Sequence, residues 1–124
     1  MKKDNLYELK NIFSSRISGW KQRADKLGVI SDQIIDSDII SILDYWDYSC
    51  VYCGNNLDST WQIDHAIPLN EKYADQYYHL NKINNLLPAC PKCNLSKSDK
   101  TYWEFANEET IDKIDYYFST ISNN

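Results

Sequence analysis

The sequence predicts a small α+β protein, with a helical N-terminal part, a metal-stapled core of short strands, and helices near the C-terminal end. Three observations predict this class: a helical apolar pattern near the start, two C-x-x-C pairs, and short alternating apolar stretches between them. The 124 residues suit one compact domain, and 43% apolar residues are enough for a core. We expect residues 1–48 to pack on, or extend, a domain formed by residues 49–124.

An amphipathic helix is predicted from Leu6 to Leu27, because apolar side chains recur there at spacings of three and four. Gly28 is the expected stop of this helix. Residues 1–26 hold seven Lys or Arg against three Asp or Glu, a net charge of +4 in a chain of net charge −5. We interpret this basic segment as either a nucleic-acid arm or an ordinary solvated helix face. The apolar positions are Leu6, Leu9, Phe13, Ile17, Trp20, Ala24 and Leu27.

Shorter elements are predicted along the rest of the chain. Asp36-Ser37 is expected to cap a second helix, with Ile39, Ile40, Leu43 and Trp46 as its apolar positions. The alternation in TWQIDHAIP predicts a strand, and NNLLPAC predicts a second extended segment. Residues 70–83 are expected to form a loop with one helical turn. Further helices are predicted from PKCNLSK, from a cap at Ser98 or Asp99 through Phe105, and in EETIDKIDYYFSTIS.

All four cysteines lie in two C-x-x-C pairs, Cys50/Cys53 and Cys90/Cys93. Two such pairs supply the four thiolates of a tetrahedral zinc site, and a zinc ion held by four thiolates is structural. Two disulfides, four buried thiols and a redox C-x-x-C are the alternatives. The N-terminal residues lack the apolar segment of a secretory signal, and no apolar run approaches the roughly 20 residues of a membrane span. We therefore expect a cytoplasmic protein without membrane contact, in which the cysteines bind Zn²⁺.

Polar residues suited to phosphodiester hydrolysis are interleaved with the cysteines. Asp64 and His65 lie between the two pairs, Asn85 precedes the second pair, and Asn94 follows it directly. A histidine of ordinary pKa, about 6.5, is a suitable general base at neutral pH. A carboxylate and an amide carbonyl are oxygen ligands that suit Mg²⁺ or Mn²⁺. Taken alone, His65 would be interpreted as a partly buried structural histidine.

The segments CVYCG, IDHAIPL and NNLLPACPKCN together resemble the zinc-stapled branch of the HNH nuclease family, over roughly residues 50–97. The resemblance implies a ββα-metal core (His-Me finger), in which two short strands and a helix surround one divalent metal. It implies that Asp64 and Asn94 bind this metal and that His65 is the general base that activates water. Asn85 would hydrogen-bond across the loop and hold the histidine strand in place.

Other positions near the motif carry weaker signals. Many relatives have a Gly-Gly turn after the Asp-His-x-x-Pro segment, whereas this chain continues from Pro68 with LNEKYADQYYHLNKI. Lys97 and His79 are expected to contact nucleic acid, and the alternatives are a solvated helix lysine and an exposed loop histidine.

The expected function is a metal-dependent endonuclease that hydrolyses DNA phosphodiester bonds, by nicking one strand or by cutting both. The alternative is a catalytically inactive, zinc-stabilised module that binds nucleic acid or protein. Nothing in the sequence separates DNA from RNA as the substrate. A homodimer or a larger phage or bacterial complex is a possible assembly.

Overall fold

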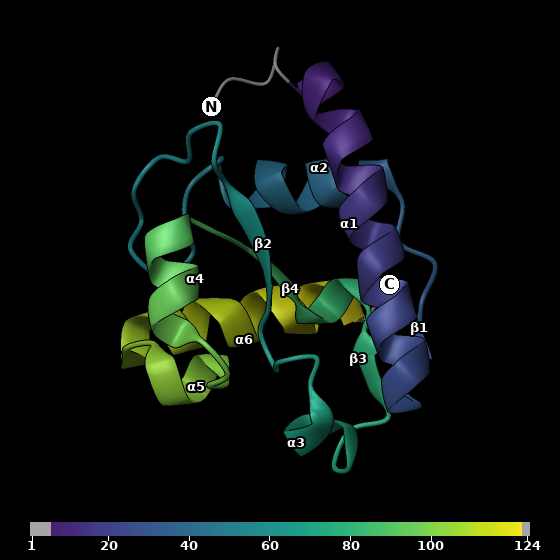
Figure 1. Cartoon of the computed structure of the whole chain (residues 1–124). Helices are drawn as coiled ribbons and strands as arrows, with labels where there is room; N and C mark the ends of the chain where they lie inside the picture. Colours follow the sequence, from purple (N-terminus) through teal and green to yellow (C-terminus); the bar gives the residue numbers. More distant parts are fainter. Residues whose placement is uncertain (1–5, 123–124) are drawn as a thin grey trace.

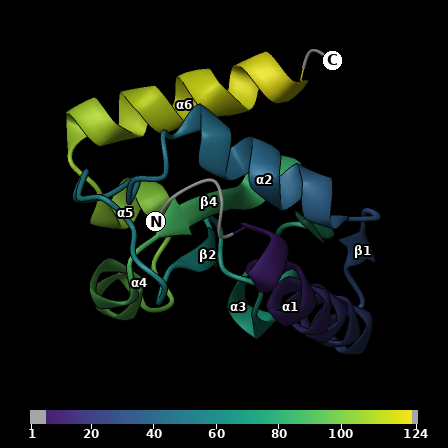
Figure 2. The same cartoon turned by 90° about the horizontal axis from the view of Figure 1, so that it is seen from above.

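The computed structural model describes residues 6–122, with side chains described for residues 15–121. Three long helices, α1 (Leu6–Leu27), α2 (Asp36–Tyr45) and α6 (Glu108–Ser122), surround a small antiparallel pair of strands. Seen from above, α2 and α6 lie on one side of this pair and α1 lies on the other (Figure 2). The mixture of helices and short strands confirms the predicted α+β class.

The first helix ends where the sequence predicts. Gly28 follows Leu27 in a left-handed conformation, with φ of +73°, which a residue with a side chain rarely adopts. Ala24 is fully buried beside Leu80 on the inward face of α1. Some of the expected inward positions lie outside the residues whose side chains are described: Leu6, Leu9 and Phe13.

The caps of two helices differ from the expected ones. Asp36 is already helical in α2, and the carboxylate of Asp38 accepts the backbone N–H of Ile35 at 2.8 Å. The short helix α5 (Tyr102–Phe105) is capped by Thr101, rather than two or three residues earlier. In both cases the carboxylate at the third helical position accepts the N–H of the cap residue. Only Thr101 also returns a side-chain hydrogen bond, because Ile35 has no acceptor in its side chain.

The two predicted strands form the centre of the molecule. Strand β2 (Gln62–His65) pairs with β4 (Leu86–Ala89) in antiparallel register, with His65 opposite Leu86. Helix α4 (Pro91–Lys97) follows β4 directly and lies beside β2 (Figure 1). Two strands and a helix are therefore arranged as the family resemblance implies.

A second, smaller pair of strands was not predicted. Strand β1 (Ile30–Ser31) runs parallel to β3 (His79–Asn81), in the segment expected to be mostly loop. The helical turn expected there is α3 (Glu71–Ala74), and a 3-10 turn (Ile83–Asn85) leads into β4. Strands of two and three residues are too short to show alternation in the sequence, so only the tertiary pairing defines them.

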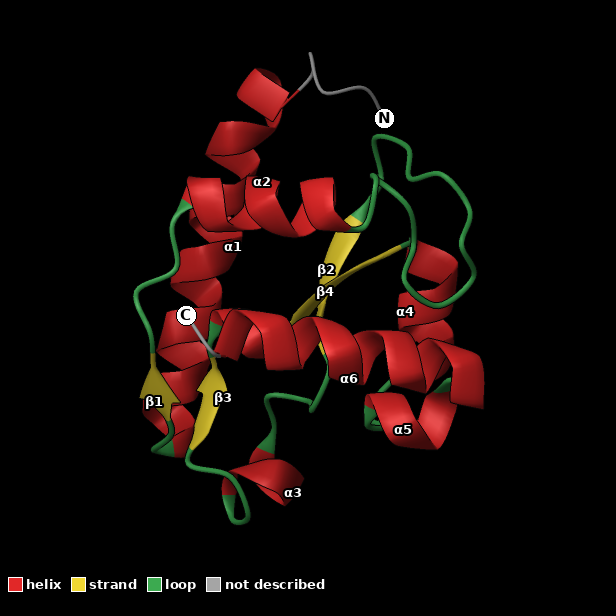
Figure 3. Cartoon of the chain, turned by 180° about the vertical axis from the view of Figure 1, so that it is seen from behind, coloured by secondary structure: helices red, strands yellow, loops and turns green. Residues whose placement is uncertain are grey.

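The core lies between the central strands and the helices. Ile42 and Leu43 of α2 are fully buried in one cluster with Leu86. Ile114 of α6 is fully buried against Leu87, and Figure 3 shows α6 passing across the strand pair in the view from behind. In the part of the chain that the structure describes, no helix has the length and apolar character needed to span a membrane.

Candidate active site and metal centre

The four cysteines meet in one cluster. Their Sγ atoms all lie within 4.8 Å of one another, and those of Cys53 and Cys90 are 4.0 Å apart. No two of them form a disulfide. Zn–S bonds of about 2.3 Å in tetrahedral geometry require S···S distances of roughly 3.8 Å. The cluster therefore fits a zinc ion held by four thiolates.

Two local structures present the thiols. The turn after Cys50 closes through Gly54, with φ of +77°, whose N–H donates to the Cys50 carbonyl at 2.9 Å. Cys90 caps α4, and its Sγ accepts the N–H of Cys93 at 3.4 Å. Pro91 occupies the first helical position, where no N–H is needed. Burial raises the pKa of Cys50 and of Cys93, so a cation is needed to favour their thiolate forms.

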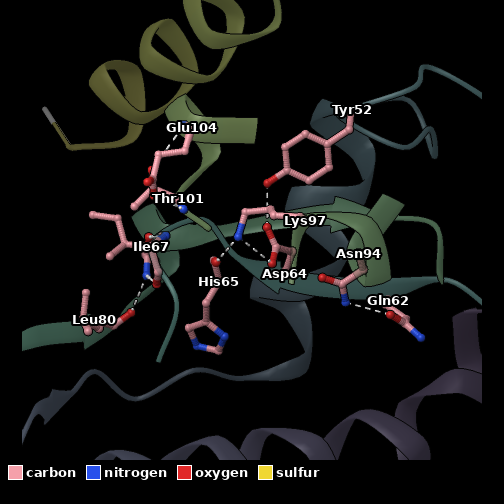
Figure 4. A network of polar contacts seen from close by, with 11 residues as sticks. Tyr52, Gln62, Asp64, His65, Ile67, Leu80, Asn94, Lys97, Thr101 and Glu104 are labelled. Carbon is pink, nitrogen blue, oxygen red and sulfur yellow. Dashed lines mark hydrogen bonds and ion pairs between the residues drawn. The ribbon is translucent and has the colours of Figure 1, made fainter. Parts of the chain in front are cut away.

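The Asp64 carboxylate is held by two donors (Figure 4). Tyr52 Oη donates to Oδ2 at 2.6 Å, and Lys97 Nζ donates to Oδ1 at 3.2 Å. Lys97 also donates to the carbonyl of His65 at 3.1 Å, and its side chain is 0% exposed. A buried ion pair therefore joins β2 to α4.

Burial and pairing act in opposite directions on this ion pair. Burial raises the pKa of Asp64, whereas the charge of Lys97 and the hydrogen bond from Tyr52 lower it. Burial lowers the pKa of Lys97, whereas Asp64 raises it. Three hydrogen bonds compensate for the burial of the two charges: Tyr52 to Asp64, Lys97 to Asp64, and Lys97 to the carbonyl of His65. We therefore assign both Asp64 and Lys97 as charged. Each carboxylate oxygen has two lone pairs, so each retains one that can bind a cation.

Asn94 presents an amide oxygen next to this carboxylate. Its Nδ2 donates to Oε1 of Gln62 at 2.7 Å, which leaves Oδ1 as the ligand atom (Figure 4). Gln62 and Asp64 are two residues apart on β2 and share one of its faces. Asn94 and Lys97 are three residues apart on α4 and share one of its faces. The strand and the helix thus bring two oxygen ligands to a common surface.

His65 points to the opposite side of β2, toward α1. Trp20 of α1 meets the imidazole edge-on, with ring centroids 5.1 Å apart and an angle of 89° between the planes. The ring Nε2 lies 3.1 Å from Oδ1 of Asn81, whose Nδ2 donates to Oγ of Ser31 at 3.1 Å. Since the Asn81 oxygen is an acceptor, Nε2 carries the proton and Nδ1 is the basic nitrogen.

The surroundings of His65 keep it neutral. Burial is the main reason why its pKa is lowered to about 4. The hydrogen bond with Asn81 raises the pKa, and the positive charges of Arg23 and Lys97 lower it. At pH 7 the imidazole is therefore unprotonated at Nδ1, which is the state that a general base requires.

One cavity connects these groups. It has a volume of about 360 Å³ and is lined by Asp64, His65 and Asn94 together. Trp20 and Arg23 of α1 form part of its wall. The remaining polar lining comes from Asn70, Ser98 and Asp99.

Asn85 lies outside this cavity and is buried behind the strand. Its Oδ1 accepts the N–H of Ile67 at 2.8 Å, and its Nδ2 donates to the carbonyls of Ile67 and Leu80, each at 2.9 Å. Through these bonds Asn85 joins the segment after His65 to Leu80 in the middle of β3.

The two residues expected to contact nucleic acid lie elsewhere. Lys97 is fully buried against Asp64, so its ammonium group reaches a phosphate only by leaving the ion pair. His79 Nε2 lies 2.7 Å from Oδ1 of Asp32 on the β1–β3 side, and His79 does not line the cavity. Neither side chain is placed for the expected contact in this structure.

Sequence reasoning missed four residues of the site. Tyr52 stands inside the first C-x-x-C pair, and Asn81 belongs to a group of three asparagines before the second pair, so both had a local signal. Trp20 and Arg23 had no local signal in the sequence, because only the packing of α1 against β2 brings them to His65.

Comparison with known proteins finds similarity over the segment that holds this site. Residues 50–100 match the family described as HNH endonuclease. Over 72 residues the chain is 33% identical to a protein of Bacillus subtilis (strain 168) named "SPbeta prophage-derived putative HNH endonuclease YoqL". The match covers 52% of this chain and 29% of YoqL, so the chain spans less than a third of the relative's length. No solved structure matches the chain significantly.

Proposed function

We propose that this protein hydrolyses DNA phosphodiester bonds with one divalent metal, Mg²⁺ or Mn²⁺, because residues 50–100 match the HNH endonuclease family. The observation that carries the proposal is the cavity shared by Asp64, His65 and Asn94. Two oxygen ligands beside a neutral imidazole suit metal-assisted hydrolysis. When bound, the metal would supply positive charge where negative charge develops on the phosphate.

His65 is the general base in this proposal. Its Nδ1 takes a proton from water while the water oxygen attacks phosphorus, so the imidazole becomes charged only during the reaction. The P–O bond to the leaving oxygen breaks, and that oxygen takes a proton from solvent. Asn81 fixes the tautomer by accepting the Nε2 proton, and Trp20 restricts the ring on the other side. Burial supports this role, because it holds the imidazole neutral before the reaction.

Asp64 and Asn94 would hold the metal. Tyr52 and Lys97 fix the carboxylate, and Gln62 orients the amide so that its oxygen faces away from the hydrogen bond. Water molecules would complete a shell of oxygen ligands, as is usual for Mg²⁺. Neither residue acts as a base.

Two further groups support the site without contacting substrate. Asn85 positions the segment after His65 through its three hydrogen bonds. The four cysteines would bind one structural Zn²⁺, which joins the turn after α2 to the start of α4.

A plasmid assay tests the proposal. Purified protein with Mg²⁺ or Mn²⁺ should convert supercoiled plasmid into nicked or linear DNA. His65→Ala should lower the rate by about 10²–10⁴-fold and leave the bound zinc unchanged. The matched comparison is His79→Ala, which removes the other histidine and lies outside the cavity, so it should cut much as the parent does. Equal rates for His65→Ala and the parent would remove His65 from the mechanism.

The products and substrates of the same assay address the finer questions. A linear product at early times would support paired sites in a dimer, whereas nicked circles that accumulate first would support a single site. Single-stranded RNA, tested in parallel, would show whether the activity is restricted to DNA.

One observation favours a second candidate, a zinc-stabilised binding module without activity. Both oxygens of Asp64 already accept a hydrogen bond, and Lys97 offsets its charge. Calorimetric titration of zinc-loaded protein with Mn²⁺ separates the two candidates. One additional site that is lost in Asp64→Asn supports the nuclease, and no additional site supports the binding module.

A further inference from the structure

Helix α1 lies outside the residues that match the HNH family, yet it forms one wall of the cavity. The purple ribbon of α1 passes beside the His65 ring in Figure 4. Trp20 packs against that ring, and Arg23 follows three residues later, nearly one helical turn along. The wall therefore combines a packing residue with a charged one.

The Arg23 side chain is exposed, and among the described residues its guanidinium has no hydrogen-bond or ion-pair partner. Lys21, two residues earlier, differs because its ammonium group is paired with Asp25 at 3.1 Å. A free guanidinium offers a planar fork of donors that matches two oxygens of a phosphate group.

The charges around the cavity make this position distinctive. Arg23 is the only Lys or Arg among the described residues that line it. Two acids also line it: Asp64, whose charge is offset by Lys97, and Asp99, which is exposed. Among the residues that line the cavity, Arg23 is therefore the one that can form a favourable ionic contact with a nucleic-acid strand approaching His65.

We propose that Arg23 is a substrate-binding residue, whose guanidinium binds a backbone phosphate of the nucleic acid at the mouth of the cavity beside His65. The inference rests on the proposed nuclease function and extends the substrate site to a helix before the matched domain. Arg23 takes no part in proton transfer. Its contact holds the strand so that the phosphate to be cut lies next to Asp64 and Asn94.

Binding measured without cutting tests this proposal. A labelled DNA duplex is titrated with zinc-loaded protein, without Mg²⁺ or Mn²⁺, at several salt concentrations, and anisotropy reports Kd. Arg23→Gln should raise Kd about tenfold at low salt. It should also reduce the slope of log Kd against log salt by about one, the value for one phosphate contact. Arg23→Lys, which keeps the charge but loses the fork, should show a smaller loss.

The matched control is Lys26→Gln, which removes the same charge from an exposed position of α1 outside the cavity. It should change Kd by less than about threefold, as a contribution from overall charge alone. Equal losses in Arg23→Gln and Lys26→Gln would overturn the proposal. Far-UV circular dichroism and zinc content establish that each variant is folded.

Plasmid cutting by the parent protein with Mg²⁺ separates this inference from the function on which it rests. A parent that neither binds nor cuts nucleic acid refutes both. A parent that cuts, together with equal binding by Arg23→Gln and Lys26→Gln, refutes only the role of Arg23.

Discussion

Replacing Lys97 with methionine removes the ammonium group that donates to Asp64 and to the carbonyl of His65, and keeps a long unbranched side chain. The Asp64 carboxylate then remains buried, with the Tyr52 hydroxyl as its remaining hydrogen-bond donor among the described residues. Removing one partner of a buried ion pair costs about 3–5 kcal/mol, because the other charge stays desolvated.

An independent argument gives a similar magnitude. In Lys97→Met, the buried Asp64 carboxylate can become neutral by binding a proton. Protonating a carboxyl group of ordinary pKa, about 3.9, costs about 4 kcal/mol at pH 7. The loss from Lys97→Met should therefore lie near 4 kcal/mol, a large part of the roughly 5–15 kcal/mol that stabilises a typical domain.

Urea unfolding of zinc-loaded protein at pH 7, followed by tryptophan fluorescence, measures this loss. With an m value of about 2 kcal/mol/M, the midpoint should fall by about 2 M. Adding Asp64→Asn to Lys97→Met removes the stranded charge and should restore at least about 2 kcal/mol. A loss below about 1 kcal/mol for Lys97→Met, or a double variant weaker than Lys97→Met alone, would refute the ion-pair assignment.

Three further predictions concern other parts of the chain. Metal analysis should find one zinc ion per chain, and a strong zinc chelator should abolish cooperative unfolding, because the thiol cluster joins two segments of the core. Ser98 has φ of +51°, a conformation that glycine adopts more easily, so Ser98→Gly should leave stability equal or raise it by about 1 kcal/mol. Ser96→Gly, inside α4, should instead lower stability by about 0.5–1 kcal/mol, and thermal unfolding compares the two variants. The pKa of Glu104 is lowered chiefly by the backbone N–H of Thr101, so its stabilising effect is present at neutral pH and lost as the pH falls through that lowered pKa. Unfolding midpoints of Glu104→Gln should therefore lie below those of the parent at pH 7 and approach them in acid.

Patterns of sequence predicted the elements that local chemistry defines. The spacing of apolar residues and Gly28 predicted α1 and its end, and alternation around Ile63 predicted β2. Two tight turns predicted the metal cluster, because the spacing within each C-x-x-C pair already limits where its thiols can point. These features depend on residues close together in the chain.

Features that depend on distant residues were not predicted. Lys97 follows Asn94 in a polar helical stretch and was expected at the surface, but Asp64 lies across from it and makes burial favourable. The position of Arg23 at the cavity likewise requires the packing of α1 beside His65 of β2. No local pattern in the sequence indicates such packing, nor that Lys97 is paired with Asp64 and His79 with Asp32.

The parallel pair of β1 and β3 makes the HNH segment dependent on the residues before it. Ser31 in β1 holds Asn81, and Asn81 holds the imidazole of His65, so a hydroxyl outside the matched stretch orients a ring inside it. Ile42 of α2 is buried in the same core as the strands. Residues 50–100 copied into another protein would therefore lose the contacts that Trp20, Ser31 and Ile42 supply to them.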